Sequence, residues 1–219
     1  MGREFDYGEA TYDRTHVVAI NYMWDIPKAS RLVNNLIVKR VLDDWQLAGI
    51  ARFASGAPLS IKGIVLGTGA INGGTDLTGG GDGWRPALIG NPNLPGDKRT
   101  VEEYFNTAAF APPITAPCSA ASLASGTCFL GNTPATWGRG PGIHNWNIGL
   151  YKNIPIRERV TMRFRAEAYN AFNHTQFSTV DTTPKWNLPG GTLATGTQFG
   201  QVTAARDPRI LQFAVRVEF

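Results

Sequence analysis

Residues 160–169, VTMRFRAEAY, alternate between two kinds of side chain. The even positions are apolar, and the odd positions are mostly charged or able to hydrogen-bond. A period of two is the pattern of a β-strand, because successive side chains point to opposite faces of a sheet. The stretch therefore predicts a strand, over about 160–172, whose polar face consists of Thr161, Arg163, Arg165, Glu167 and Tyr169.

The same alternation returns in four other stretches of the chain. They predict strands near 15–26, 45–55, 144–154 and 209–219. Connections rich in Gly, Pro and Thr separate these strands, above all 56–142 and 174–208, whereas residues 155–159 make a short turn. An excursion as long as 56–142 is uncommon in a compact domain, and it indicates a functional loop or a disordered insertion, with a short helix over 101–110.

Composition excludes several classes of protein. The chain has 219 residues, of which 42% are hydrophobic and 17% charged, with 25 Gly and 14 Pro. This apolar content is too high for a disordered chain, and so much Gly and Pro argues against a helical bundle. A transmembrane helix is not expected either, because no run of 18 apolar residues occurs.

Charge and motifs argue against nucleic-acid binding and against catalysis. The net charge of +4 comes from basic residues spread along the chain, without a recognisable nucleic-acid-binding pattern. Nucleophile and metalloprotease motifs are also missing, and His16, His144 and His174 are far apart in sequence. We therefore expect no catalytic group, no bound metal and no cofactor.

Strand length and loop asymmetry favour a membrane barrel. Several runs reach about nine to eleven residues, the length that a tilted strand needs to cross a bilayer. Long connections at 56–142 and 174–208 alternate with the short turn at 155–159, as in outer-membrane barrels, where short turns are periplasmic and long loops external. A soluble, secreted β-sandwich that binds a carbohydrate or a protein remains an alternative at this point, because it combines similar elements.

The barrel hypothesis assigns the candidate residues. The polar face of 160–169 would line the lumen, and the long external loop would contact a ligand. Its exposed candidates are Trp84, Arg85, Tyr104, Phe105 and Trp137, although some of these aromatic side chains could instead pack the loop onto itself. Cys118 and Cys128, ten positions apart, suit a local disulfide in an oxidising compartment, with two free thiols as the alternative.

Five stretches of the chain resemble the barrel region of TonB-dependent outer-membrane receptors of the Oar-like type. The most specific are GRGPGIHNWNIGLYKNIPIRERVTMRFRAEAYNAFNHTQF at 138–177 and the ending FGQVTAARDPRILQFAVRVEF at 199–219. The others are DRTHVVAINYMWDIP at 13–27, DDWQLAGIARFASGAPLS at 43–60 and EEYFNTAAFAPP at 102–113. In the ending, Phe213, Val215, Val217 and Phe219 look like the signal that the barrel-assembly machinery reads.

The resemblance implies a large barrel with a plugged lumen in the outer membrane of a Gram-negative bacterium. Such receptors import a large or scarce substrate with energy that TonB passes from the inner membrane. The partners so implied are outer-membrane lipid, the barrel-assembly machinery, a plug domain, TonB and a substrate that cannot be named from the sequence.

This chain is much shorter than such a receptor. Five strands alone would leave two open sheet edges in lipid, where each unpaired backbone group costs several kcal/mol. The opening MGREFDYGEA also lacks the apolar core of a secretory signal. We therefore expect residues 1–219 to be about five C-terminal strands of a larger all-β, antiparallel transmembrane barrel with long extracellular loops, whose plug and TonB-contacting part precede it.

Overall fold

The computed structural model describes residues 7–32, 35–61, 64–66, 85–112, 131–157, 159–187 and 192–219. The chain divides into two compact units. The sheet unit consists of Thr15–Ser55, Gly142–Gln176 and Arg206–Phe219, and the loop unit consists of Met1–Arg14, Gly56–Pro141 and Phe177–Ala205. No helix among the described residues is both long enough and apolar enough to cross a membrane.

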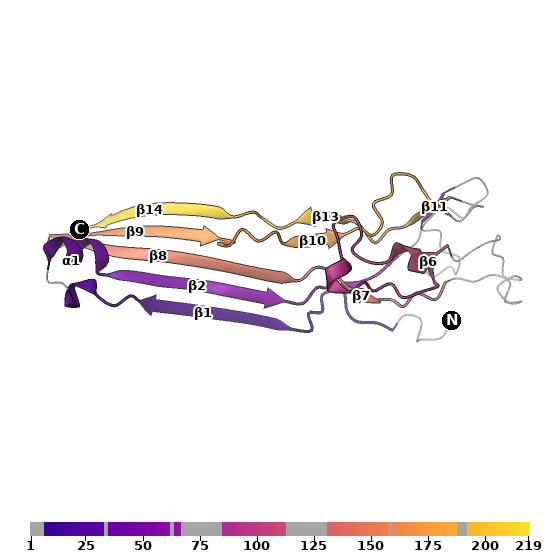
Figure 1. Cartoon of the computed structure of the whole chain (residues 1–219), viewed down its shortest axis with the longest axis horizontal. Helices are drawn as coiled ribbons and strands as arrows, with labels where there is room; N and C mark the ends of the chain where they lie inside the picture. Colours follow the sequence, from indigo (N-terminus) through magenta and orange to yellow (C-terminus); the bar gives the residue numbers. More distant parts are fainter. Residues whose placement is uncertain are drawn as a thin grey trace, which may run out of the picture. The chain divides into compact units, whose positions relative to one another are not determined.

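The sheet unit is built on one antiparallel sheet of five strands (Figure 1). The strand order is β1-β2-β8-β9-β14, and each strand pairs antiparallel with its neighbours. The all-β, antiparallel fold class is therefore confirmed. The bounds of the strands are β1 Val17–Asp25, β2 Trp45–Ala54, β8 Ile143–Arg157, β9 Val160–Tyr169 and β14 Ile210–Glu218.

Strand β9 is shorter than the alternation suggested. It was expected to continue to about residue 172, but it ends at Tyr169. The reason is Asn170, whose φ of 49° lies in the left-handed region, which a strand cannot adopt. Its side-chain oxygen accepts a hydrogen bond from the amide of His174 at 3.1 Å, and its side-chain nitrogen donates to the carbonyl of the same residue. Asparagine thus turns the chain through its own side chain.

Register separates the sheet into two chemically different faces. Residues directly opposite each other on neighbouring strands point to the same face. Phe164 lies opposite Val215 and Leu150 opposite Ala166, whereas Glu167 lies opposite Gln212. The apolar face includes Val18, Ile20, Trp24, Trp45, Leu47, Phe53, Trp146, Ile148, Leu150, Met162, Phe164, Phe213 and Val215. The polar face includes Asn21, Asp25, Gln46, Arg52, Asn145, Asn147, Tyr151, Asn153, Arg163, Arg165, Glu167, Gln212, Arg216 and Glu218.

The connection between β1 and β2 contains two short helices that the sequence patterns did not indicate. These are η2 (Ala29–Arg31) and α1 (Leu36–Leu42). Asn35 caps α1, since its side-chain oxygen accepts a hydrogen bond from the amide of Ile37 at 2.8 Å. Asp43 is 1% exposed and accepts hydrogen bonds from the amide of Ser30 at 3.0 Å and from its hydroxyl at 2.5 Å. The connection is therefore an ordered corner.

The corner is expected to respond to acid. The Ser30 hydroxyl, followed by the Ser30 amide, holds the pKa of Asp43 below its ordinary value of 3.8. A lowered folded-state pKa means that this stabilisation is complete above the ordinary value and disappears as the pH falls through the folded-state pKa. Replacing Ser30 by Ala should therefore lower the Tm at neutral pH, and the Tm difference from the wild type should shrink in acid below 3.8. A difference that is unchanged by acid would contradict this account.

The loop unit combines short strand pairs with two 3₁₀ turns. The pairs are β3 (Pro58–Leu59) with β7 (Gly138–Arg139), β5 (Ala87–Leu88) with β6 (Phe110–Ala111), and β10 (Phe177–Val180) with β13 (Val202–Ala205). A further sheet has the order β12 (Thr192–Leu193), β11 (Lys185–Asn187), β4 (Ile64–Leu66). The 3₁₀ turns are η3 (Gly96–Lys98) and η4 (Thr107–Ala109).

A hydrophobic core holds the loop unit together. Its buried residues are Ile61, Tyr104, Phe105, Ala109, Phe110, Val180, Trp186 and Phe199. Phe105, Phe110 and Phe199 contact one another edge to face, with ring centroids 5.2–5.9 Å apart. The two long connections predicted from the sequence, 56–142 and 174–208, thus contribute jointly to one packed unit.

The helix predicted over 101–110 is wrong. Only Thr107–Ala109 is helical in this stretch, as the single 3₁₀ turn η4. The amide of Tyr104 donates to the carbonyl of Gly200 at 2.8 Å, and the carbonyl of Val101 accepts from the amide of Val202 at 2.8 Å. These backbone groups bond to a distant segment of the chain, so they are not available for helical hydrogen bonds.

Candidate functional site

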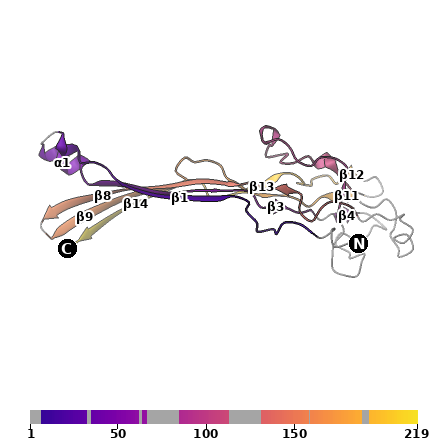
Figure 2. The same ribbon diagram turned by 90° about the horizontal axis from the view of Figure 1, so that it is seen from below.

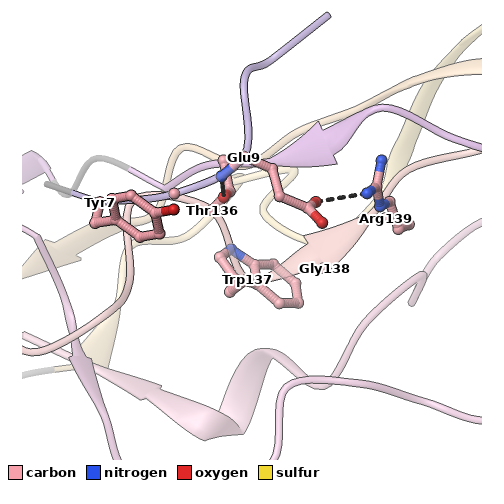
Figure 3. A pocket seen from close by; sticks show the side chains of 7 residues that line it. Tyr7, Glu9, Thr136, Trp137, Gly138 and Arg139 are labelled. Atoms are coloured by element: carbon pink, nitrogen blue, oxygen red, sulfur yellow. Dashed lines mark hydrogen bonds and ion pairs between the residues drawn. The ribbon is translucent and has the colours of Figure 1, made fainter. Parts of the chain in front are cut away.

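A pocket of about 520 Å³ opens in the loop unit (Figure 3). Its lining comes from two segments that are more than a hundred residues apart in sequence. One is the N-terminal segment, and the other leads into β7. The lining residues are Tyr7, Gly8, Glu9, Thr136, Trp137, Gly138 and Arg139.

Close backbone contacts hold the two segments together. The amide of Glu9 donates to the Thr136 hydroxyl at 2.9 Å. A Cβ atom on Gly8 would lie 2.8 Å from that hydroxyl and 2.9 Å from the side chain of Ala135, so this approach requires glycine. Real Cβ atoms essentially never come closer than 3.0 Å to such neighbours, so a larger residue at position 8 would push the two segments apart.

Arg139 is the electrostatic centre of the pocket. Its guanidinium lies 2.6 Å from the carboxylate of Glu9 and 2.8 Å from that of Asp13. The hydrogen bond to Asp13 is the largest of the contacts that raise the pKa of Arg139. Two carboxylates share one guanidinium, so the cluster of Glu9, Asp13 and Arg139 carries a net negative charge beside the pocket.

Replacing Arg139 by Lys should loosen the N-terminal segment. A lysine keeps the charge but cannot present two donors to two carboxylates in a fixed fork. We expect amide hydrogen exchange at Glu9 to become several-fold faster, with exchange in β8 and β9 unchanged. Equal exchange in the variant and the wild type would mean that the fork does not hold this segment.

Trp137 connects the pocket with the core of the loop unit. Its ring contacts those of Phe105 and Phe110, at centroid distances of 4.9 and 5.2 Å. Its indole nitrogen is buried and has no hydrogen-bond partner among the described residues. Tyr7, on the other segment, is 86% exposed. The pocket lining therefore contains the packed ring of Trp137, the exposed ring of Tyr7 and the charged side chains of Glu9 and Arg139.

The loop residues predicted as exposed ligand contacts differ in how exposed the structure shows them to be. Trp84 lies outside the described residues, and Arg85 is partly buried just before β5. Tyr104 and Phe105 are only 9% and 2% exposed, so their prediction as exposed side chains is wrong. The cause is aromatic clustering, which is the alternative in which some of these side chains pack the loop onto itself. Burial also raises the pKa of the Tyr104 hydroxyl, against the opposing effect of Arg99.

Tyr7, Glu9 and Arg139 were missed by sequence reasoning. Nothing in the spacing along the chain relates the N-terminal segment to β7, because their association depends on tertiary contacts. The same holds for His144 and His174, whose rings lie 5.4 Å apart although 30 positions separate them in the sequence. Among the described residues, no group of three or more His, Cys, Asp or Glu side chains could hold a metal ion.

The five residues predicted to line a lumen lie together on the polar face of β9, where two clusters of polar contacts form. Arg165 lies 2.6 Å from Glu167, which also accepts a hydrogen bond from Tyr151 at 2.9 Å. Arg163 donates to the side-chain oxygen of Asn153 at 3.0 Å. Partners from β8 and β9 thus satisfy the charged groups across the sheet.

A family model described as Outer membrane beta barrel domain matches residues 2–212. The chain belongs to this family. No curated protein and no solved structure matches the chain.

Membership of the outer membrane β-barrel family places the protein in the outer membrane of Gram-negative bacteria, which confirms the predicted localisation. It also confirms the barrel interpretation of the antiparallel strands and leaves the soluble β-sandwich alternative without support. Lipid is accordingly the environment of this protein. The apolar face carries unusually exposed side chains for a folded sheet, among them Ile20, Phe213 and Val215, as expected where lipid replaces water.

The remaining candidates concern the C-terminal signal and the disulfide. Phe213, Val215 and Val217 alternate along β14 on the apolar face, and Phe219 follows the strand. All four side chains are exposed. Their role in barrel assembly stays a prediction. Cys118 and Cys128 lie outside the described residues, so their pairing stays a prediction as well.

Proposed function

We propose that this chain is the C-terminal barrel region of a TonB-dependent receptor that binds a large or scarce substrate and imports it across the outer membrane. The observation that carries the proposal is the two-faced sheet: one face is apolar and exposed, and the other holds charged side chains in mutual contact. The resemblance to Oar-like receptors supports the same conclusion, and the family membership supports its outer-membrane barrel part.

The edges of the sheet support a larger barrel. In the described part of the chain, β1 pairs only with β2, and β14 pairs only with β9. An open strand edge in hydrocarbon leaves backbone groups unsatisfied at a cost of several kcal/mol each. Further strands must therefore close the sheet, and in this proposal they belong to the same receptor, together with the plug domain and the TonB-contacting segment.

The polar face would line the lumen in this arrangement. Thr161, Arg163, Arg165, Glu167 and Tyr169 would then face the plug, with which charged side chains can form ion pairs away from lipid. The loop unit would lie outside the cell and contact the substrate, with the pocket at Tyr7, Trp137 and Arg139 as its binding surface. Binding and transport in this proposal involve no enzymatic step and no cofactor.

The proposal is tested with the full-length gene product in detergent micelles and planar bilayers. We expect it to retain the periplasmic domain of TonB on an affinity column and to show no persistent ion conductance, because a plug fills the lumen. A control variant without the TonB-contacting segment should lose the retention and stay closed. A steadily conducting pore that does not bind TonB would instead make the protein a porin-like channel and overturn the proposal.

A further inference from the structure

The short helix α1 exposes an apolar surface that the rest of the sheet unit does not cover. None of its residues is buried, and Ile37 and Val41 are 71% and 53% exposed. These two positions are four apart, so they share one side of the helix. Lys39 lies on the opposite side of the helix at 3.6 residues per turn, whereas Arg40 borders the apolar side, about 60° from Ile37. The helix therefore has an open apolar side with one cation opposite it and one at its edge.

A hydrogen bond holds α1 beside the apolar face of the sheet. The indole nitrogen of Trp45 donates to the carbonyl of Val41 at 2.8 Å. Trp45 is the register partner of Lys152, and Leu47 is the register partner of Leu150. Because Trp45 and Leu47 are two positions apart in β2, Trp45 shares the apolar face with Leu47. Figure 2 shows α1 at the end of the sheet unit where the C terminus lies, to one side of the strands. The helix thus continues the apolar face at its rim.

This rim has the composition of a membrane interface. Trp24 and Trp45 lie at the ends of β1 and β2, where amphipathic rings favour the headgroup level. Lys152 is a cation on the apolar face, and its ammonium lies 5.2 Å from the ring centroid of Trp45 and 2.5 Å from the carbonyl of Asp43. Lys152 lies within β8, opposite Phe164, and its long side chain carries the charge from there toward the carbonyl of Asp43 at the corner.

Three cations of the connection are available for an external partner. In the part of the chain that the structure describes, Arg31, Lys39 and Arg40 have no ion pair, whereas Lys28 is 3.0 Å from Asp44. An apolar side and free cations on one short helix are the features of helices that lie in the headgroup region of anionic membranes.

We propose that α1 is an interfacial helix that binds anionic phospholipid in the periplasmic leaflet of the outer membrane. Ile37 and Val41 would enter the acyl boundary, and Lys39 and Arg40 would bind phosphate groups. The proposal rests on the lipid-facing assignment of the apolar face in the proposed function. It adds that the β1–β2 connection anchors the barrel at a defined depth, in addition to joining two strands.

Spin labels provide the first test. Single cysteines replace Ile37, Val41, Lys39 or Val215 in the full-length protein, in a Cys118→Ser and Cys128→Ser background, and the labelled protein is reconstituted in vesicles of phosphatidylethanolamine and phosphatidylglycerol. Labels at 37, 41 and 215 should collide mainly with oxygen, which partitions into lipid, and the label at 39 with a water-soluble nickel chelate. A lipid-exposed label at 215 with a water-exposed label at 37 would overturn the helix proposal alone. Water exposure at 215 would overturn the barrel assignment.

Lipid retention provides the second test. The purified protein is washed in detergent, and the phosphatidylglycerol that remains bound is measured by mass spectrometry. The double variant Lys39→Gln, Arg40→Gln should retain several-fold less than the wild type. The control Arg209→Gln removes an exposed cation just before β14 and should retain the normal amount. Equal retention by both variants would contradict the phosphate contacts of α1.

Discussion

Arginine in place of Phe164 is expected to destabilise the protein in membranes by about 2–4 kcal/mol, the cost of a cation that faces lipid near the bilayer midplane. Phe164 lies in the middle of β9, and its register partners Lys152 and Val215 share the apolar face. The cost arises because the guanidinium cannot reach water without displacing its own strand or thinning the bilayer. Reversible unfolding of the full-length protein in lipid vesicles by guanidinium chloride measures the change.

Two matched variants separate lipid exposure from damage to the strand. Gln212→Arg introduces the same side chain on the polar face, opposite Glu167, and should cost little. Arg163→Ala removes a cation from that face and leaves Asn153 without its 3.0 Å hydrogen bond, which should cost about 1 kcal/mol. Equal losses in Phe164→Arg and Gln212→Arg would mean that the faces have been assigned incorrectly.

Replacing Phe105 by Ala should destabilise the loop unit by about 3–5 kcal/mol, as expected for the loss of a fully buried aromatic ring. Phe105 contacts Phe110, Trp137 and Phe199, all within ring-centroid distances of 5.9 Å. Its removal leaves a cavity at the centre of these contacts. Amide hydrogen exchange should become faster across the loop unit, at Val180 and Trp186 as well as near position 105, and remain slow in the sheet unit.

Tyr7→Ala is the control, because it removes an aromatic ring that is exposed at the pocket. It should leave hydrogen exchange in the core unchanged. If Phe105→Ala behaved like Tyr7→Ala, Phe105 would be a surface residue and its burial in the core would be refuted. The pair of variants thus distinguishes the aromatic rings that build the loop unit from those that could contact a substrate.

The five long strands could be predicted because their information is local. Alternation within each strand specifies which side chains share a face, and a membrane strand must keep its lipid side apolar over its whole length. The same local signal placed the charged residues of β9 on one face, where the register brings them beside Tyr151 and Asn153. The turn after β9 was not predicted, and Asn170, which follows the last strand residue Tyr169, shows how a single left-handed residue interrupts a pattern that would otherwise continue.

The loop unit could not be predicted in the same way. Its strands have two to four residues, too few for a period of two to be recognised, and their partners lie far along the chain. The helix expected over 101–110 failed because the backbone of Val101 and Tyr104 bonds to residues near 200. Local propensity is a weak preference, and distant partners override it when they satisfy the same donors and acceptors.

By itself the sequence thus determined that this protein has long two-faced strands, which of their side chains share a face, and that lipid suits one of those faces. Only the tertiary structure decided that Tyr104 and Phe105 form a core, that Glu9 meets Arg139 at a pocket, and that Trp45 fastens α1 to the rim of the apolar face. The physical reason is the range of the interactions. Alternation is specified by neighbouring residues, whereas a core, a pocket or an anchored helix depends on groups that meet only when the chain has folded.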